Sequence, residues 1–232
     1  AGVSLDGGVT FSTIYNQPTA QFYHIAADTR DPYVVYGTQQ DNSSVAVPSE
    51  VRGYTGIRWA DSYPAGSGES GYIAVRPDNP DIVYVGAIGS SPGGGNALQR
   101  YDHRTRQIRL ITTWPEGNRG GGAAALRQRF AWTYPIIISP HDPNRLYIGG
   151  NQVYTSTNEG QSWEPISPDL TRADPETLQP TGGPVNLAAA LRRHAQPLVA
   201  TAVDDGVADH LQPRRGDGRA GRAGKTMAVP RE

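Results

Sequence analysis

The chain has 232 residues, enough for one large all-β domain or two small ones. Its 28 glycines, 19 prolines and 12 tyrosines, with only 37% hydrophobic residues, are typical of many short strands joined by tight turns rather than of a helical fold. The formal net charge is −1, and no stripe of lysine and arginine interleaves with aromatic residues, so we expect no nucleic-acid partner.

No apolar run approaches the roughly 18 residues that span a bilayer, so we expect no membrane partner. The N-terminus carries no basic and apolar signal segment. The absence of cysteine excludes disulfides, thiolate metal sites and a cysteine nucleophile. Because the chain begins at Ala1 in the middle of a pattern, we interpret it as a fragment of a longer protein.

Two segments, residues 4–11 and 156–163, fit the pattern Ser-x-(Asp/Asn)-x-Gly-x-(Ser/Thr)-aromatic. In such a segment the Asp or Asn side chain accepts hydrogen bonds from its own turn, glycine supplies a positive φ, and the aromatic ring packs between sheets. This chemistry predicts a structural turn and not a catalytic site. The residues that define the two turns are Ser4, Asp6, Gly8 and Phe11 in the first, and Ser156, Asn158, Gly160 and Trp163 in the second.

A second pattern recurs three times along the chain, at residues 23–37, 72–86 and 135–149. Each copy has a short β-branched run, a turn that contains proline, and a second apolar run that ends at glycine, so each predicts a β-hairpin. A tyrosine always lies four residues beyond the proline of the turn. The apolar runs are continuous rather than alternating, which indicates strands that are covered on both faces.

Two further strands are predicted after the second and third copies. They lie around turns at residues 103–106 and 158–160. Four strands in each repeating unit are typical of a propeller blade. A generic antiparallel sandwich is the alternative, but sandwiches do not repeat a sequence motif in this way.

The two turn segments resemble the Asp-box of sialidases, xyloglucanase-type glycosidases, sortilin-like (VPS10) domains and related BNR-repeat proteins. The wider resemblance covers residues 1–184 and is to bacterial secreted proteins of the BNR-repeat glycosyl hydrolase or sortilin-like type. It implies an all-β fold, a β-propeller fragment of four-stranded antiparallel blades with Asp-box turns. It also implies a secreted or periplasmic location and a carbohydrate partner.

The repeats divide the chain into three blades with connecting segments. Beyond residue 184 the chain lacks aromatic residues and β-branched runs, so we expect an irregular tail that is either read out of frame or added to the native protein. Fewer than four blades cannot close a ring, and we therefore expect a homo-oligomer that covers the exposed edges. The predicted units are the end of a preceding blade with an Asp-box (1–20), blades at 21–65, 66–116 and 135–184, a Gly/Arg-rich connection (117–134) and the tail (185–232).

Two acidic residues flank predicted inner strands of neighbouring blades. Asp41 directly follows one such strand, and Glu69 directly precedes another. Propeller ligands bind where inner strands and their loops converge, so both carboxyl groups are expected at the same axial mouth. Glycoside hydrolysis needs one protonated and one ionised carboxyl group, and this pair is the candidate. The alternative is that both acids only hydrogen-bond the loop backbone.

Polar and aromatic residues near these acids suit sugar hydroxyls and a stacking face. The candidate substrate-binding residues are Gln39, Gln40, Asn42, Trp59, Tyr63 and Tyr72.

Other chemistries have weaker support. The arginines match no sialidase-type triad, the five histidines have no metal-ligand spacing, and we expect neither a metal nor a cofactor. A Gly-x-Ser-x-Gly match at residues 89–93 has Pro92 where an oxyanion N–H would be needed.

Two functions stay open. The first is a carbohydrate-active propeller, by resemblance a glycoside hydrolase acting on polysaccharide or glycoside bonds. The second is a non-catalytic sortilin-like binding or scaffold propeller for a peptide or glycan.

Overall fold

The computed structural model describes most of the chain up to residue 179, and nothing beyond it. Within the described ranges the regular structure is β-strand, with two short 3-10 helices at Trp59–Asp61 and Ala123–Ala125 and no α-helix. The described ranges are residues 2–13, 20–53, 56–69, 71–86, 97–115, 123–131 and 133–179. The predicted irregular tail lies outside them.

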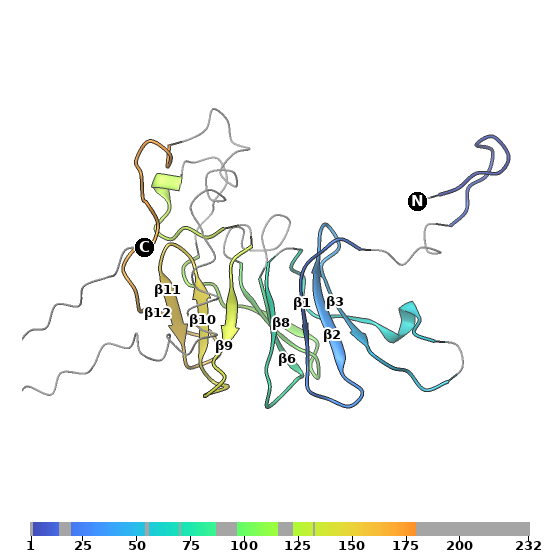
Figure 1. The fold of residues 1–232 in the computed structure, drawn as a ribbon, viewed down its shortest axis with the longest axis horizontal. Helices are drawn as coiled ribbons and strands as arrows, with labels where there is room; N and C mark the ends of the chain where they lie inside the picture. The colour runs from blue at the N-terminus through green and yellow to red at the C-terminus, as the bar shows by residue number, and fades with distance from the viewer. Residues whose placement is uncertain are drawn as a thin grey trace, which may run out of the picture.

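The described strands form three four-stranded antiparallel sheets, each built from consecutive strands (Figure 1). The fold is therefore all-β and propeller-like, as the composition and repeats predict. The first sheet contains β1 (Phe22–Ala27), β2 (Val34–Gln39), β3 (Ser44–Pro48) and β4 (Tyr63–Pro64). The second contains β5 (Ile73–Val75), β6 (Ile82–Val85), β7 (Gln99–Asp102) and β8 (Gln107–Leu110). The third contains β9 (Ile136–Ile138), β10 (Leu146–Gly149), β11 (Val153–Ser156) and β12 (Glu164–Pro165).

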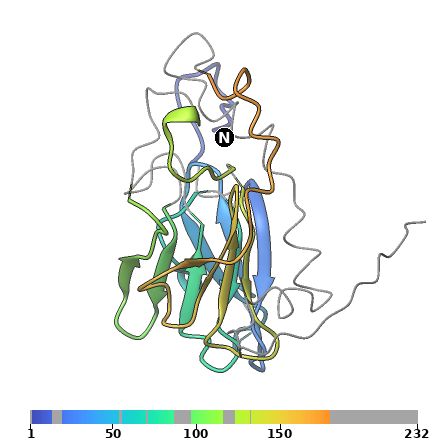
Figure 2. The ribbon, with the colours of Figure 1, turned by 90° about the vertical axis from the view of Figure 1, so that its left-hand side faces the viewer.

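The sheets stand side by side, with their first strands next to one another (Figures 1 and 2). Strand β5 contacts β1 on one side and β9 on the other. The first strands are therefore the innermost ones. We call the end with the turns from first to second strands the lower end, as drawn in Figure 1, and the end with the turns from second to third strands the upper end.

One hydrophobic core lies between the first and second sheets. Val34 and Tyr36 of β2 pack there against Val83 and Val85 of β6. These four residues are at most 8% exposed. The hydroxyl of Tyr36 is paired at the core edge, as a buried phenol requires.

A second core lies between the second and third sheets. Ile82 and Tyr84 of β6 pack there against Leu146 and Ile148 of β10. Strand β6 thus buries alternate side chains on opposite faces, one set in each core. This two-sided burial explains its continuous apolar sequence.

Polar contacts join the first two sheets at their lower end. Asp28 pairs with Arg30 at 2.5 Å and accepts a hydrogen bond from the Tyr36 hydroxyl at 3.0 Å. The Tyr36 hydroxyl lies 3.3 Å from that of Tyr63, whose ring stacks on His103 of the second sheet with centroids 3.9 Å apart. The network thus crosses from one sheet to the next.

Charged contacts also join the second and third sheets at their lower end. Glu159 pairs with Arg76 at 3.1 Å and with Arg100 at 2.9 Å. Arg76 also donates to the side-chain oxygen of Asn144 at 2.6 Å. Charge-assisted contacts of this kind are stronger than neutral ones. They fix how the third sheet sits on the second.

The two predicted turns have the same internal hydrogen bonds. The Ser4 hydroxyl donates to Asp6 Oδ1 at 2.8 Å and accepts from the Gly8 N–H at 2.7 Å. In the second turn the Ser156 hydroxyl makes the same two bonds with Asn158 and Gly160, at 2.9 Å each. Hydrogen bonds from Thr10 lower the pKa of Asp6 to about 2. Both turns are therefore held by their own side chains.

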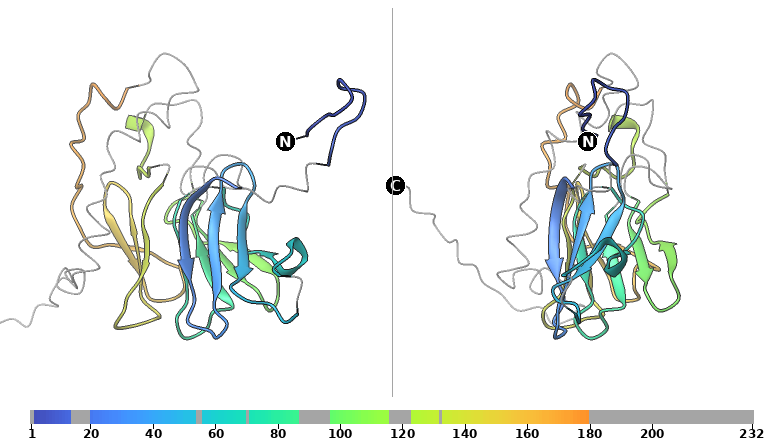
Figure 3. Two further views of the ribbon diagram at one scale, coloured as in Figure 1. Left: turned by 45° about the vertical axis from the view of Figure 1, so that its right-hand side comes forward. Right: turned by 90° about the vertical axis from the view of Figure 1, so that its right-hand side faces the viewer.

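The two turns differ in what they contact. Trp163 of the second turn packs against the second core and donates its indole N–H to the Ile111 carbonyl at 2.7 Å. Phe11 of the first turn is 66% exposed, and its segment stands apart from the sheets in Figures 1 and 3. Of these two turns, only the second therefore packs its aromatic ring against the sheets.

Equivalent glycines of the two turns give a matched test of this packing. Gly160 has φ +76°, and a Cβ there would lie 2.6 Å from Ile111 Cδ1, whereas Gly8 has φ +94° and no contact closer than 4.0 Å. We expect Gly160→Ala to cost roughly 2–5 kcal/mol of stability, because backbone strain and overpacking add. Gly8→Ala should leave the melting temperature of the sheets almost unchanged. Thermal unfolding followed by circular dichroism measures both, and equal effects would contradict the packing.

Two histidine–tyrosine stacks between the first two sheets make stability depend on pH. Burial lowers the pKa of His24, which stacks on Tyr72, and of His103, where Arg106 and Arg30 act in the same direction and Asp81 opposes them. The folded protein therefore binds these protons less readily than the unfolded chain, whose histidine pKa is 6.5. The neutral imidazoles of His24 and His103 contribute fully to the free energy of unfolding above pH 6.5. This contribution declines as the pH falls below 6.5, because the unfolded chain then takes up protons more readily.

Urea unfolding at pH 7.5 and pH 5.0 tests this dependence. We expect a lower urea midpoint at pH 5.0 than at pH 7.5. The difference between the two midpoints should be smaller in His103→Gln, because glutamine cannot take up the proton. The same midpoint at both pH values in the parent would contradict the predicted pH dependence.

Candidate functional site

The turn between β2 and β3 places several polar side chains at the upper end of the first sheet. It closes through hydrogen bonds from the Gln39 N–H to the Ser43 carbonyl and from the Asn42 N–H to the Gln39 carbonyl. Asp41 and Ser43 have φ values of +58° and +59°. Asp adopts this left-handed region more readily than most residues. The turn therefore exposes the Asp41 side chain to solvent.

Glu69 reaches the same turn from the segment before β5. Its side chain is buried, with the residue only 4% exposed, and Oε2 accepts a hydrogen bond from the Asp41 N–H at 3.2 Å. Two buried hydroxyls hold this segment against the first sheet. Thr38 donates to the Gly71 carbonyl and Ser44 to the Gly68 carbonyl, at 2.7 Å each. The structure thus brings the two predicted acids together from neighbouring sheets.

The Asp41 carboxylate is oriented by its neighbours. Gln40 donates its side-chain amide N–H to Asp41 Oδ1 at 2.7 Å, and the Tyr23 hydroxyl donates to the amide oxygen of the same Gln40. Asn42 donates its side-chain amide to the Gln40 carbonyl at 3.2 Å. One side chain, Gln40, therefore binds the exposed carboxylate directly, and Tyr23 and Asn42 hold Gln40 in place.

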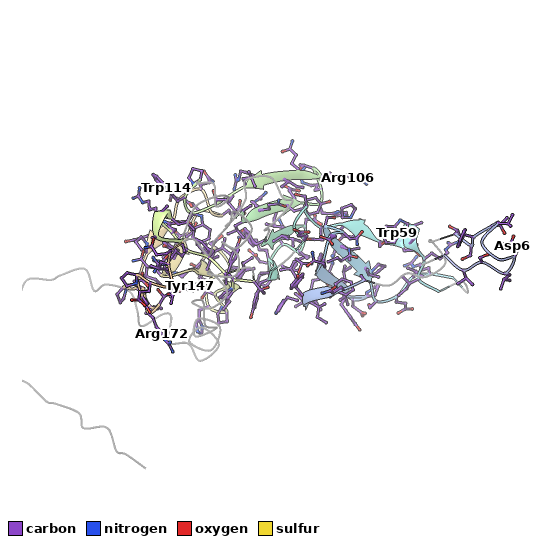
Figure 4. All side chains as sticks on the ribbon, turned by 90° about the horizontal axis from the view of Figure 1, so that it is seen from above. Asp6, Trp59, Arg106, Trp114, Tyr147 and Arg172 are labelled. Carbon is purple, nitrogen blue, oxygen red and sulfur yellow. The ribbon has the colours of Figure 1, made fainter. Side chains whose placement is uncertain are left out.

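The other predicted residues fall into two groups. Gln39 lies buried at the end of β2, and Tyr72 lies just before β5, stacked on His24 with centroids 4.2 Å apart. Both are at the upper end with the acids. Tyr63 is committed to the lower network between the sheets. Trp59, 78% exposed, lies in the connection from β3 to β4, on the outer side of the first sheet (Figure 4).

Sequence reasoning missed two residues of this region, Tyr23 and His24. Both lie at the start of β1, which pairs with the end of β2 through Phe22 and Gln39. The repeat marks Tyr23 as the start of a strand, but only the register of the ladder brings it to Gln40.

The described residues hold no cluster of three or more potential metal-ligating side chains. In the same part of the chain, no helix is long and apolar enough to cross a membrane.

The site is therefore one exposed and one buried carboxylic acid on adjacent segments, with amide, phenol and imidazole groups nearby. Such a set can exchange protons and bind hydroxyl groups. It does not by itself identify a substrate.

No protein-family model matches the chain. A curated protein described as probable oligoxyloglucan-reducing end-specific xyloglucanase, from Neosartorya fischeri, is 24% identical over 186 residues. The match covers 72% of this chain and 21% of that protein, so the chain spans about a fifth of the length of the relative that it matches.

The two acids should differ in their contribution to stability. Glu69→Ala removes the acceptor of the Asp41 N–H and leaves a buried gap, so we expect a loss of about 1–3 kcal/mol. Asp41→Asn keeps the turn geometry at an exposed position and should change the free energy of unfolding by less than about 0.5 kcal/mol. Urea unfolding measures both. A larger loss for Asp41→Asn than for Glu69→Ala would contradict the placement of the two side chains.

Proposed function

We propose that this chain is part of a carbohydrate-active protein, a glycoside hydrolase in which Asp41 and Glu69 are the reacting acids. The observation that carries the proposal is the hydrogen bond of 3.2 Å from the Asp41 N–H to Glu69 Oε2, which joins acids of two neighbouring sheets. Glycoside hydrolysis uses two carboxyl groups in different environments, one protonated and one ionised. The exposed Asp41 and the buried Glu69 have different environments.

The surrounding side chains fit a sugar substrate. Gln40, Asn42 and Tyr23 offer amide and phenol groups that can exchange hydrogen bonds with hydroxyls. Tyr72 adds an aromatic ring of the kind on which sugar rings stack. These residues would orient the substrate beside Asp41.

The similarity to a protein named as a xyloglucanase supports the same chemistry at the level of glycoside hydrolases. The match is distant and covers a fifth of that protein, so xyloglucan is one substrate to test among several. Plant and bacterial cell-wall polysaccharides lie outside the cytoplasm, and for a substrate of this kind we propose a secreted or periplasmic location.

We also propose that the three sheets are blades of a β-propeller and that the two turns are Asp-boxes of the BNR type. Their shared hydrogen bonds support this proposal, together with the contacts among the innermost strands. In a propeller the upper ends of inner strands converge on the axis, where a ligand can bind.

A non-catalytic binding module, similar to sortilin-like domains, is the second candidate. The burial of Glu69 favours it, because a buried carboxylate that accepts a backbone N–H also serves to hold two segments together. In that case the polar upper end would bind a peptide or glycan without cleaving it.

Release of reducing sugar tests the proposal. We expect the chain to cleave at least one of a panel of xyloglucan oligosaccharides, other plant and bacterial polysaccharides and aryl glycosides. Because both carboxyl groups take part in the reaction, the double variant Asp41→Asn, Glu69→Gln should lower kcat by at least 100-fold.

The matched control is Glu50→Gln. Glu50 is an exposed acid at the lower end of the first sheet, away from the candidate site, so this variant should retain full activity. Each variant must unfold at a urea midpoint close to that of the parent. A folded parent that cleaves nothing on the panel but binds a glycan would reject the hydrolase and favour the binding module.

A further inference from the structure

Strand β1 departs from the repeat at its upper end. Two of its residues, Tyr23 and His24, lie opposite the single residue Thr38 of β2, because the register shifts between Phe22 and Ile25. The other inner strands, β5 and β9, pair with their neighbours without such a shift. An extra residue of this kind is a β-bulge, a feature that redirects side chains and often lies beside a functional site. The bulge therefore distinguishes the first sheet from the other two at the end that carries the acids.

The two side chains of the bulge reach different parts of the candidate site. Tyr23 donates its hydroxyl to the amide oxygen of Gln40, in the turn between β2 and β3. The ring of His24 stacks on that of Tyr72, just before β5, with centroids 4.2 Å apart and planes inclined by 22°. Tyr72 lies three residues after Glu69. The bulge thus holds His24 against the segment of one acid, while its neighbour Tyr23 contacts the turn of the other.

The imidazole of His24 has a buried nitrogen without a hydrogen-bond partner. Its Nδ1 is enclosed, and no described residue donates to it or accepts from it. Buried polar atoms are normally paired, so an exception calls for an explanation. His103 provides the comparison, because its ring stacks on Tyr63 in the same manner and its Nδ1 lies 3.3 Å from the Tyr101 hydroxyl. The fold therefore satisfies one stacked histidine and leaves the other with unused hydrogen-bonding capacity.

The position of the proton on His24 follows from this burial. Burial lowers the pKa of the imidazole, so the ring is neutral at pH 7 and one nitrogen carries the proton. A buried N–H without an acceptor is rarer than a buried acceptor without a donor, which puts the proton on Nε2. The residue is partly exposed, and Nε2 is not enclosed as Nδ1 is. His24 therefore presents a neutral N–H donor at the upper end.

The charge at this end selects the class of ligand. The exposed carboxylate of Asp41 repels anions, so a phosphate or carboxylate ligand is disfavoured. A sugar hydroxyl is neutral and both donates and accepts hydrogen bonds. One sugar can therefore accept from the imidazole of His24 and donate to Asp41.

We propose that His24 is a substrate-binding residue of the candidate site, where its Nε2–H donates to a sugar hydroxyl while Tyr72 holds the ring in place. The inference rests on the proposed carbohydrate function and adds a residue to it. The residue directly before the first regular ladder pair of the inner strand is His24 in the first sheet, Tyr72 in the second and Pro135 in the third. Of the three sheets, only the first therefore places an imidazole there.

Isothermal titration calorimetry with a xyloglucan oligosaccharide tests the proposal. All proteins in this titration carry Glu69→Gln, which slows cleavage and keeps the Asp41 carboxylate. His24→Phe retains a ring that can stack on Tyr72 but has no N–H, and we expect it to raise the dissociation constant about fivefold. His103→Phe makes the same change in the lower stack, so it is the matched control and should leave the dissociation constant unchanged. Equal effects of the two changes would overturn the proposal.

Turnover is measured separately, so the role of His24 and the hydrolase can fail independently. A parent that releases reducing sugar, with an unchanged dissociation constant in His24→Phe, overturns the role of His24 and leaves the hydrolase standing. A parent that binds the sugar without cleaving it, with weaker binding in His24→Phe, rejects the hydrolase and supports the role of His24. A folded chain that binds no sugar overturns both.

A spectroscopic measurement stands even if His24→Phe fails to fold. Long-range proton–nitrogen NMR spectra of the nitrogen-labelled parent show which ring nitrogen of each histidine carries the proton. At pH 7 we expect the proton of His24 on Nε2, and we expect that resonance to shift when the xyloglucan oligosaccharide is added, while the resonances of His103 stay in place. A proton on Nδ1, or a His24 resonance that the sugar does not move, would reject the proposal.

Discussion

The burial of both faces of a β-sheet is the constraint on which this structure depends. Strand β6 sends Ile82 and Tyr84 into one core and Val83 and Val85 into the other, so the second sheet must have a sheet on each side. This requirement orients the three sheets face to face and brings β1, β5 and β9 together as innermost strands. The location of every turn, and of the candidate site, follows from that arrangement.

The two ends of the sheets use polar residues differently. At the lower end, Asp28 and Arg30 form an ion pair within the first sheet, and Glu159 forms one with Arg100 between sheets. The Trp163 indole of the second turn donates a hydrogen bond to the Ile111 carbonyl. At the upper end, the Asp41 N–H donates a hydrogen bond to Glu69 Oε2, and Asp41 faces solvent. Contacts between the sheets lie at both ends, because Thr38 and Ser44 also bind the segment before β5 at the upper end. What distinguishes the upper end is the exposed Asp41 beside the buried Glu69.

Much of the fold could be predicted because the determinants are local. The proline turns, the apolar runs and the serine–glycine turns each act within about ten residues, and the structure forms strands and turns at those places. Asp41 and Glu69 lie near each other because both flank strands of neighbouring units, and the Asp41 N–H donates a hydrogen bond to Glu69 Oε2. Trp59 and Tyr63 lie between the two acids in sequence, yet β3 carries the chain to the other end of the sheet before Trp59.

The sequence by itself determined the repeating unit, its four strands and the acids beside its inner strands, since short-range turn chemistry and hydrophobic periodicity specify these features. Only the tertiary structure decided that Tyr23 and Gln40 orient Asp41 and that Glu69 is buried. These features depend on ladder register and on which sheet packs against which. Contacts between residues distant in sequence set both, and no local pattern encodes them.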